Sequence, residues 1–285
     1  MKFPIPFTKM SGAGNDFIII DNREQLITHG EMSRFARLVC RRRLSVGADG
    51  LVLLENSPSA DFRWQFLNAD GSLAEMCGNA SRCAARFAHH RGIAGPEMVF
   101  ETLAGRISAR VNGMEVDVRM TDPLDFRLNI PIEEAGDIDC CHFVNTGVPH
   151  VVLFVDDPAA TDVEATGRLL RYHREFMPAG TNVNFVHSLA DGRLAVRTYE
   201  RGVEAETLAC GTGCVAAALV GSALGIVTSP VETLPISGDR LTIRFDLREG
   251  PAAENVHMQG PAHEIYQGEL TTEAIIENAD TYKVN

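Results

Sequence analysis

The sequence predicts an α+β fold made of two similar domains, and three observations lead to this prediction. Segments typical of strands outnumber those typical of helices, and they come in runs instead of alternating strictly with helices. Two segments in opposite halves, Asp70–Ala88 and Arg201–Gly221, share one pattern. The 285 residues, 45% of them apolar, are enough for two domains of ordinary size.

In the first half, helices are expected at Glu31–Arg42 and Gly78–His90, where apolar residues recur with helical spacing. Short runs rich in Val, Ile, Leu and Phe predict strands around these helices. The strands are expected at Phe17–Asp21, Leu51–Glu55, Phe62–Leu67, Met98–Glu101, Ile107–Val111 and Met114–Val118.

The second half repeats the theme. Helices are expected at Val163–Tyr172 and Gly211–Leu224. Strands are expected at Val151–Val155, Val183–His187, Leu194–Tyr199, Leu241–Phe245 and Ile265–Leu270.

The segment between the halves, Thr121–Ala135, carries two prolines and little periodicity. Such a composition is typical of a linker. We therefore expect a first domain over residues 1–124 and a second over residues 125–285.

Charge and cysteine content argue against several functions. The formal net charge of -12 disfavours nucleic acid or an anionic membrane as a partner. No apolar run approaches the roughly 20 residues of a membrane span, and prolines interrupt the N-terminal segment where a secretory signal would lie. Seven cysteines, an odd number in a long chain, favour free thiols in a cytoplasmic protein.

Cys77 and Cys210 differ from the other cysteines in their surroundings. Each follows a glutamate by a few residues and precedes a glycine, a polar residue and an Ala-rich helix. They lie about half the chain apart, which predicts one Cys-Gly turn at a helix start in each domain. Chance likeness between two Ala-rich helices is the alternative interpretation.

A cysteine at a helix start is well placed for chemistry. The following glycine lets the backbone approach a ligand closely, and the unpaired N–H groups of the first turn form an anion site. The helix dipole lowers the pKa of a thiol there and favours the thiolate. Cys40 and Cys83, by contrast, are expected to pack on apolar helix faces.

Two such turns that face one cleft suit inversion at a carbon next to a carboxylate. One cysteine thiolate would remove the α-proton from one face, and the other cysteine, as a thiol, would deliver a proton to the opposite face. The helix N–H groups would stabilise the charge that develops on the carboxylate oxygens. The residues therefore predict an enzyme that inverts a carbon next to a carboxylate, with Cys77 and Cys210 as its acid/base pair.

Blocks along nearly the whole chain resemble the diaminopimelate epimerase family. The most specific are LNADGSLAEMCGNASRC (Leu67–Cys83) and YERGVEAETLACGTG (Tyr199–Gly213), which contain the two cysteines. The others, in the family's order, are SGAGNDF (Ser11–Phe17), GADGLVLLE (Gly47–Glu55), NTGVPH (Asn145–His150), GTNVNF (Gly180–Phe185) and GPA (Gly260–Ala262).

The resemblance implies a particular fold and reaction. It implies two domains, each a mixed β-sheet wrapped around a central helix, with the active site in the cleft between them. The implied reaction interconverts LL- and meso-diaminopimelate, in lysine and peptidoglycan precursor biosynthesis, without pyridoxal phosphate or metal. It also implies a homodimer with a small-molecule amino-acid substrate, and about the last 15 residues returning to the first domain.

The resemblance assigns roles by position. The residues that would hold the reacting carboxylate are Gly78, Asn79, Gly211 and Thr212. Those that would bind the rest of the substrate are Asn15, Asn68, Asn182, Glu200 and Arg201. Their types fit a second amino-acid end, because an arginine can grip a carboxylate with two bonds, while carboxylate and amide oxygens accept from an ammonium.

Four features depart from the family pattern. Gly50 stands where some members have Gln, Val148 where many have an Asn that touches the substrate, and Ala80 where Gly is usual. The stretch between Glu200 and Cys210 is one residue longer than in some members. These departures concern recognition of the far end of the substrate and leave the cysteine chemistry intact.

Three alternatives stay open at this point. A racemase of the same fold acting on histidine or hydroxyproline would keep both cysteines. A thiol redox sensor would use Cys77 and Cys210 to form a reversible disulfide. A binding protein for dibasic amino acids would need the asparagines and Arg201 but neither sulfur.

Overall fold

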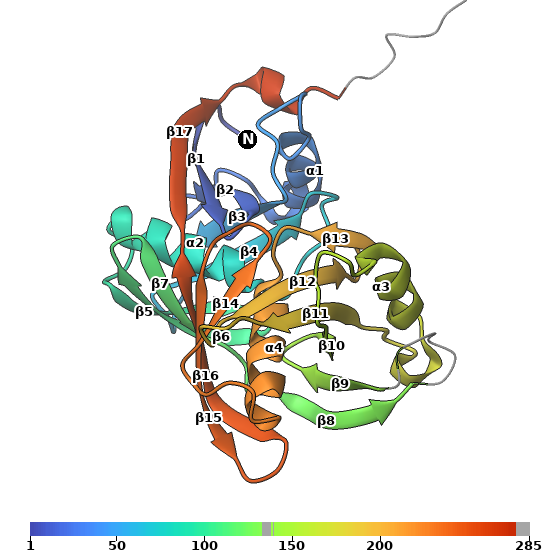
Figure 1. Cartoon of the computed structure of the whole chain (residues 1–285). Helices are drawn as coiled ribbons and strands as arrows, with labels where there is room; N and C mark the ends of the chain where they lie inside the picture. Colours follow the sequence, from blue (N-terminus) through green and yellow to red (C-terminus); the bar gives the residue numbers. More distant parts are fainter. Residues whose placement is uncertain (133–137, 139, 278–285) are drawn as a thin grey trace, which may run out of the picture. The chain divides into compact units, whose positions relative to one another are not determined.

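The computed structural model describes residues 1–132, 138 and 140–277, which fall into two compact units (Figure 1). Unit 1 joins residues 1–114 to the segment from 262 onward, and unit 2 comprises residues 115–261. This division differs from the expected boundary at 124/125. The reason is that β7 (Glu115–Arg119) pairs with β16 (Ala252–Pro261), so the chain enters unit 2 directly after Met114.

The sheet of unit 1 uses strands from both ends of the chain. Its strands are β1 (Ile5–Gly12), β2 (Asn15–Asp21), β3 (Gly50–Glu55), β4 (Phe62–Asn68), β5 (Glu97–Thr102), β6 (Gly105–Asn112) and β17 (His263–Leu270). From β17 through β1 to β6, successive pairs are antiparallel, antiparallel, parallel, antiparallel, parallel and antiparallel.

Unit 2 repeats this order of pairings. Its further strands are β8 (Leu124–Pro131), β9 (Cys140–Asn145), β10 (Pro149–Phe154), β11 (Asn182–Ser188), β12 (Leu194–Glu200), β13 (Ala205–Thr207), β14 (Val231–Pro235) and β15 (Leu241–Arg248). From β8 through β12 to β14 and β15, the pairs are again antiparallel, antiparallel, parallel, antiparallel, parallel and antiparallel. The prediction of two similar α+β domains is confirmed.

One helix occupies the middle of each unit. In unit 1, α2 (Gly78–His90) contacts β1, β2, β3, β6 and β17. In unit 2, α4 (Gly211–Ala223) contacts β9, β10, β11, β12, β14, β15 and β16 (Figure 1). Helix α4 is built almost entirely from Ala, Val, Leu and Gly, and a helix that is apolar all round belongs in a core. Both helices match the expected positions closely.

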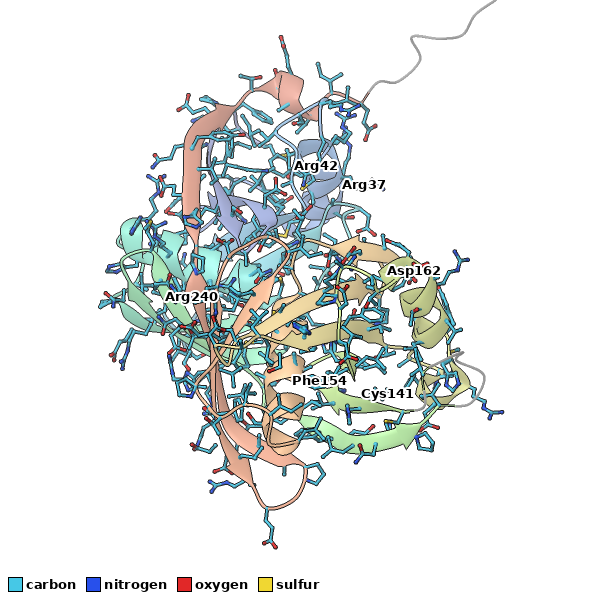
Figure 2. The ribbon with its side chains drawn as sticks, viewed as in Figure 1. Arg37, Arg42, Cys141, Phe154, Asp162 and Arg240 are labelled. Atoms are coloured by element: carbon cyan, nitrogen blue, oxygen red, sulfur yellow. The ribbon has the colours of Figure 1, made fainter. Side chains whose placement is uncertain are left out.

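The other helices lie against outer faces. Helix α1 (His29–Val39) buries Met32 and Phe35 against strands of unit 1, while the short η2 (Thr272–Ile275) lies beside it. In unit 2, α3 (Val163–Arg171) packs on β11 and β12 and is followed by η1 (Arg174–Phe176). Asp162 stands at the start of α3 (Figure 2), where its side chain accepts a hydrogen bond from the Ala165 N–H at 3.0 Å.

Two expectations need correction. Helix α1 runs from 29 to 39 instead of 31 to 42, because a capping box of Thr28 and Glu31 fixes its start. The predicted linker Thr121–Ala135 is wrong, since it contains β8, whose pairing with β9 is interrupted around Asp125 and Asn129. Both residues have left-handed backbones (φ 46° and 54°), which removes the regular alternation of a strand. Residues 133–135 of that prediction lie outside the described residues.

The sequence patterns also missed β1, β9, β13, β14 and β16. Within the described part of the chain, no helix combines the length and apolar character needed to cross a membrane.

Candidate active site

Cys77 is the residue on which α2 begins. Its backbone is extended (φ -146°, ψ 124°), and its carbonyl accepts the N–H of Ser81 at 2.8 Å, the first bond of the helix. No side-chain bond caps this helix start in the described structure, and the first turn contains no acidic residue. The N–H groups of Gly78 and Asn79 are therefore left without intrahelical acceptors, as an anion site requires.

Cys210 begins α4 in the same way. Its backbone is also extended (φ -123°, ψ 105°), and its carbonyl accepts from the Cys214 N–H at 3.0 Å. No side-chain cap is described here either, so Gly211 and Thr212 present first-turn N–H groups. Each unit thus contains one extended cysteine followed by a glycine on the first turn of its central helix.

The surroundings of Cys210 favour its thiol form. Burial raises the pKa of this thiol well above its usual value, and the Glu200 carboxylate adds to the effect. The Thr212 hydroxyl, 3.4 Å from the sulfur, and the Gly213 N–H act in the opposite direction. The expected lowering of the pKa at a helix start is therefore wrong for Cys210, because desolvation outweighs the two bonds.

Two of the asparagines of unit 1 that the sequence singled out, Asn15 and Asn79, are in contact with each other. Asn79 is almost fully buried and donates from its side-chain amide to the carbonyl oxygen of Asn15 at 2.7 Å. Asn68 is exposed at the end of β4 and donates to the Ser72 hydroxyl at 3.0 Å. Asp70 accepts from the Ser72 N–H at 2.8 Å, so its side chain belongs to the turn that follows β4.

The corresponding residues of unit 2 are also held together. The Asn182 side chain donates to the Pro149 carbonyl at 3.0 Å and accepts the Arg201 N–H at 2.8 Å. The Arg201 guanidinium donates to the Ala179 carbonyl at 2.9 Å, and Glu200 accepts from the Thr207 hydroxyl at 2.9 Å. These bonds fix Asn182, Glu200 and Arg201 at one end of β11 and β12.

Strand register relates the polar positions of the two units. In unit 1, Gly50 of β3 faces Asn68 of β4. In unit 2, Val183 of β11 faces Tyr199 of β12. Because the two strands are antiparallel, the next pair along is Asn182 opposite Glu200. Gly50 therefore stands where unit 2 has Asn182, and Asn68 where unit 2 has Glu200.

Packing explains why residue 50 is a glycine. A Cβ atom at this position would lie 2.7 Å from the Phe66 ring and 2.8 Å from the Leu67 carbonyl oxygen. Both distances are far below van der Waals contact, so a side chain such as Gln does not fit while Phe66 occupies this space. The departure at Gly50 is thus tied to an aromatic residue in the neighbouring strand.

A buried polar cluster behind the start of α4 was missed by the sequence analysis as a group. Asn184 donates to the Val151 carbonyl at 2.8 Å, faces His150 Nδ1 at 3.1 Å, and accepts from the Thr198 hydroxyl at 3.0 Å. His150 is fully buried, and desolvation lowers its pKa to about 3. Its ring is therefore neutral. The one sequence signal for this cluster is the spacing of two between Asn182 and Asn184 in GTNVNF, which predicts that both side chains lie on the same face of the strand.

Burial argues against reactivity in three of the other cysteines. None of the seven forms a disulfide. Burial raises the pKa of Cys40, Cys83 and Cys141 to about 12 in each case, which confirms Cys40 and Cys83 as packing residues. Cys140 is exposed at the start of β9.

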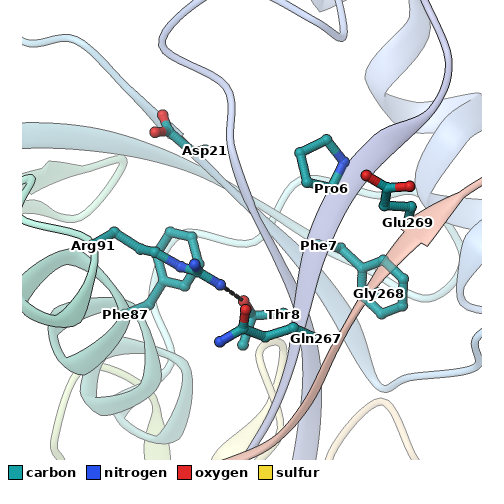
Figure 3. A pocket seen from close by; sticks show the side chains of 9 residues that line it. All are labelled: Pro6, Phe7, Thr8, Asp21, Phe87, Arg91, Gln267, Gly268 and Glu269. Carbon is teal, nitrogen blue, oxygen red and sulfur yellow. Dashed lines mark hydrogen bonds between the residues drawn. The ribbon is translucent and has the colours of Figure 1, made fainter.

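Unit 1 also contains a pocket of about 460 Å³ beside β1 and β17 (Figure 3). Arg91 lies over the Phe87 ring at 5.5 Å from its centre and donates to the Thr8 hydroxyl at 2.9 Å. The residues predicted for the site do not line this pocket. Among the described residues, no three His, Cys, Asp or Glu side chains are grouped so that they could hold a metal ion.

Solved structures share this architecture at low sequence identity. A PhzF-family phenazine biosynthesis protein from Bacillus anthracis matches with a TM-score of 0.72 and 17% identity, covering 95% of this chain and 100% of its own. A hydroxyproline epimerase from Agrobacterium vitis, with trans-4-hydroxy-L-proline bound, matches with a TM-score of 0.66 and 19% identity. The match covers 94% of this chain and 93% of that protein. Fold and pairing order together define a protein of the two-domain diaminopimelate epimerase-like fold.

Comparison of sequences identifies the family within that class. A family model described as diaminopimelate epimerase matches residues 7–124 and 142–268. The diaminopimelate epimerase of Aquifex aeolicus is 46% identical, covering 94% of this chain and 99% of its own length. The diaminopimelate epimerase of Chlorobaculum tepidum is 46% identical, covering 92% of this chain and 100% of its own length. The chain belongs to the diaminopimelate epimerase family.

Proposed function

We propose that this protein interconverts LL- and meso-diaminopimelate, with Cys77 and Cys210 as the acid/base pair. One observation carries the proposal: each of two similarly built units places a cysteine, in extended conformation, directly before the first turn of its central helix. Family membership supports the choice of substrate.

The first-turn N–H groups have the task of holding the reacting carboxylate. Gly78 and Asn79 supply them on α2, and Gly211 and Thr212 on α4. An α-proton next to a carboxylate is very weakly acidic, because its loss leaves negative charge on the carbon and the carboxylate oxygens. Donors that already point at those oxygens stabilise this charge without having to reorganise.

The proton then moves in two steps on opposite faces of the α-carbon. In one direction, the Cys77 thiolate accepts the α-proton, and the electron pair of the broken C–H bond spreads into the carboxylate. The Cys210 thiol, whose protonated form burial favours, delivers its proton to the other face and becomes the thiolate. The reverse reaction exchanges the two roles, so the protonation states belong to the pair.

The far end of the substrate is a second amino acid and needs both donors and acceptors. Arg201 is suited to its carboxylate, while Glu200 and the carbonyl oxygen of Asn68 are suited to its ammonium. Asn15 and Asn182 complete this set. Bonds to Pro149, Ala179 and Thr207 hold the unit 2 members in place, which reduces the ordering required when the substrate binds.

Proton NMR of LL-diaminopimelate in D₂O, with reduced protein and no added cofactor, tests the proposal. We expect loss of the α-proton signal and appearance of the meso isomer. Cys77→Ser and Cys210→Ser should each abolish epimerisation, whereas Cys140→Ser, which changes an exposed cysteine, should keep it. Turnover of hydroxyproline or histidine instead of diaminopimelate would overturn the substrate assignment. Full activity of both serine variants would overturn the mechanism and favour the redox-sensor reading.

We further propose that the protein acts as a cytoplasmic homodimer without a cofactor. Family resemblance supports the dimer and the absence of pyridoxal phosphate, and the seven cysteines outside disulfides agree with a reducing compartment. Light scattering on a sizing column gives the oligomeric mass directly. A monomer at micromolar concentration with full activity would contradict the dimer.

A further inference from the structure

Four side chains of unit 1 form one continuous line of hydrogen bonds next to the Cys77 turn. The Arg82 guanidinium donates to the carbonyl oxygen of Asn79 at 2.8 Å. The Asn79 amide donates to the carbonyl oxygen of Asn15 at 2.7 Å, and the Asn15 amide donates to the Asp49 carboxylate at 3.1 Å. We call this line, Arg82–Asn79–Asn15–Asp49, the amide relay.

The chemistry of the two ends fixes the direction of the relay. A guanidinium can only donate, so the atom of Asn79 that faces Arg82 must be its oxygen. An ionised carboxylate can only accept, so the atom of Asn15 that faces Asp49 must be its nitrogen. Both ends demand the same orientation, since a flip of the two amides would place NH₂ against the guanidinium and oxygen against the carboxylate.

Both ends of the relay are anchored. Arg82 is fully buried in α2, one turn from Gly78, whose carbonyl it also approaches at 3.4 Å. The Asp49 carboxylate accepts from Arg42 at 2.8 Å and from the Asp16 N–H at 3.2 Å. The two ends are therefore held independently of any ligand.

The relay uses one amide N–H of each asparagine. An amide nitrogen carries two hydrogens, so Asn15 and Asn79 each keep one N–H that bonds to no described residue. With both amides flipped, a carbonyl oxygen would point in the direction that this N–H now takes. An oxygen there would repel a carboxylate, whereas an N–H would bind it.

We propose that Asp49 and Arg82 are positioning residues, which hold the side-chain amides of Asn15 and Asn79 as hydrogen-bond donors to the carboxylates of the substrate. The inference rests on the proposed function and adds two residues that do not themselves touch the substrate. It also explains why a buried arginine stands so close to the Cys77 turn.

Two substitutions at Asp49 separate this role from a purely structural one. Asp49→Asn keeps the size and shape but replaces the acceptor-only end by a group that can also donate. Asp49→Glu changes the size but keeps the acceptor-only end, and the partly exposed position leaves room for it. A role that depends only on the size and shape of the side chain makes the isosteric Asn the milder change, whereas the relay makes Asn the more harmful one. A role through the ion pair with Arg42 would also make Asn more harmful, but would lower the melting temperature together with kcat/KM.

The experiment compares kcat/KM for epimerisation of diaminopimelate with the melting temperature of each variant. We expect Asp49→Asn to lower kcat/KM by about tenfold to a hundredfold, the effect of one misplaced hydrogen bond to a charged group. Asp49→Glu should stay within about threefold of the native protein, and the melting temperature should not follow this order. A larger loss for Glu than for Asn, or no loss in either, overturns the proposal.

NMR of the ligand-free protein reads the relay independently of the reaction. Asn15 and Asn79 side-chain amide protons should exchange with D₂O about tenfold faster in Asp49→Asn, and at nearly the native rate in Asp49→Glu. Unchanged exchange in Asp49→Asn overturns the relay even if the enzyme is active. If the native protein does not turn over diaminopimelate, the proposed function fails, while the exchange rates still decide whether the relay exists.

Discussion

The packing behind the start of α4 makes Gly213→Ala a demanding test of the structure. A Cβ atom at residue 213 would lie 2.2 Å from the Asn184 side-chain oxygen and 3.2 Å from the Thr198 hydroxyl. Asn184 is not free to move aside, because its oxygen accepts from Thr198 at 3.0 Å and its nitrogen donates to the Val151 carbonyl at 2.8 Å. Either Asn184 or the first turn of the helix has to shift.

The expected loss of stability in Gly213→Ala can be estimated from the contacts that the new methyl group disrupts. Displacing Asn184 removes two buried hydrogen bonds of about 1 kcal/mol each, and overpacking of a core typically costs about 1–3 kcal/mol. The better helix propensity of alanine returns at most about 1 kcal/mol. We expect Gly213→Ala to lower the free energy of unfolding by about 2–4 kcal/mol. Epimerisation should also slow, because the Gly213 N–H bonds to the Cys210 sulfur.

Urea unfolding measures the stability change, and two further variants interpret it. Gly30→Ala is the matched control, because it is also a glycine within a helix but has no atom within 4 Å of the new Cβ. It should be neutral or stabilising by up to about 1 kcal/mol. Adding Asn184→Ala to Gly213→Ala removes the clash, so the double variant should be more stable than the sum of the single changes predicts.

Two results would refute this reasoning. Native-like stability of Gly213→Ala would mean that the Asn184 side chain can move aside with little loss in the free energy of unfolding. Additive losses in the double variant would mean that residues 213 and 184 do not oppose each other.

Three further predictions concern pH and local bonds. His150 titrates at a pKa of about 3 when folded and near 6.5 when unfolded, so it contributes stability above pH 6.5 that is lost as the pH falls toward 3. Over this range the free energy of unfolding should fall by about 1.4 kcal/mol per pH unit because of His150. Urea unfolding at pH 7 and pH 5 should therefore show a smaller fall in His150→Asn than in the native protein, and an equal fall would contradict the assignment. Thr212→Val removes a bond that lowers the pKa of Cys210, so alkylation of this thiol should shift to higher pH, and an unshifted profile would exclude the bond. Asp162→Ala removes the cap of α3 and should cost about 1 kcal/mol in thermal unfolding, an expectation that an unchanged melting temperature would defeat.

Local signals explain why the two central helices were predictable. The Cys-Gly turn and the Ala-rich segment after it lie within a few neighbouring residues, and α2 and α4 begin at the expected glycines, Gly78 and Gly211. The strand β8 was not predictable in this way, because the left-handed residues Asp125 and Asn129 break the alternation on which strand prediction depends.

Other properties depend on contacts that sequence patterns do not contain. The bond between Asn15 and Asn79 joins residues 64 positions apart, and only the fold brings them together. The raised pKa of Cys210 reflects burial, whereas its sequence context suggests the opposite shift. The fit of Phe66 around Gly50 likewise appears only when β3 and β4 are paired.

The pairing of β1 with β17 also has a consequence for biosynthesis. Unit 2 ends at Pro261, so all its strands are synthesised before β17, whereas β1 lacks its second neighbour until β17 has been made. A nascent chain halted at this point would carry an open strand edge along β1, a template for pairing with other chains. The whole unit that contains Cys210 is therefore synthesised before the unit that contains Cys77 is complete, although Cys77 comes first in the chain.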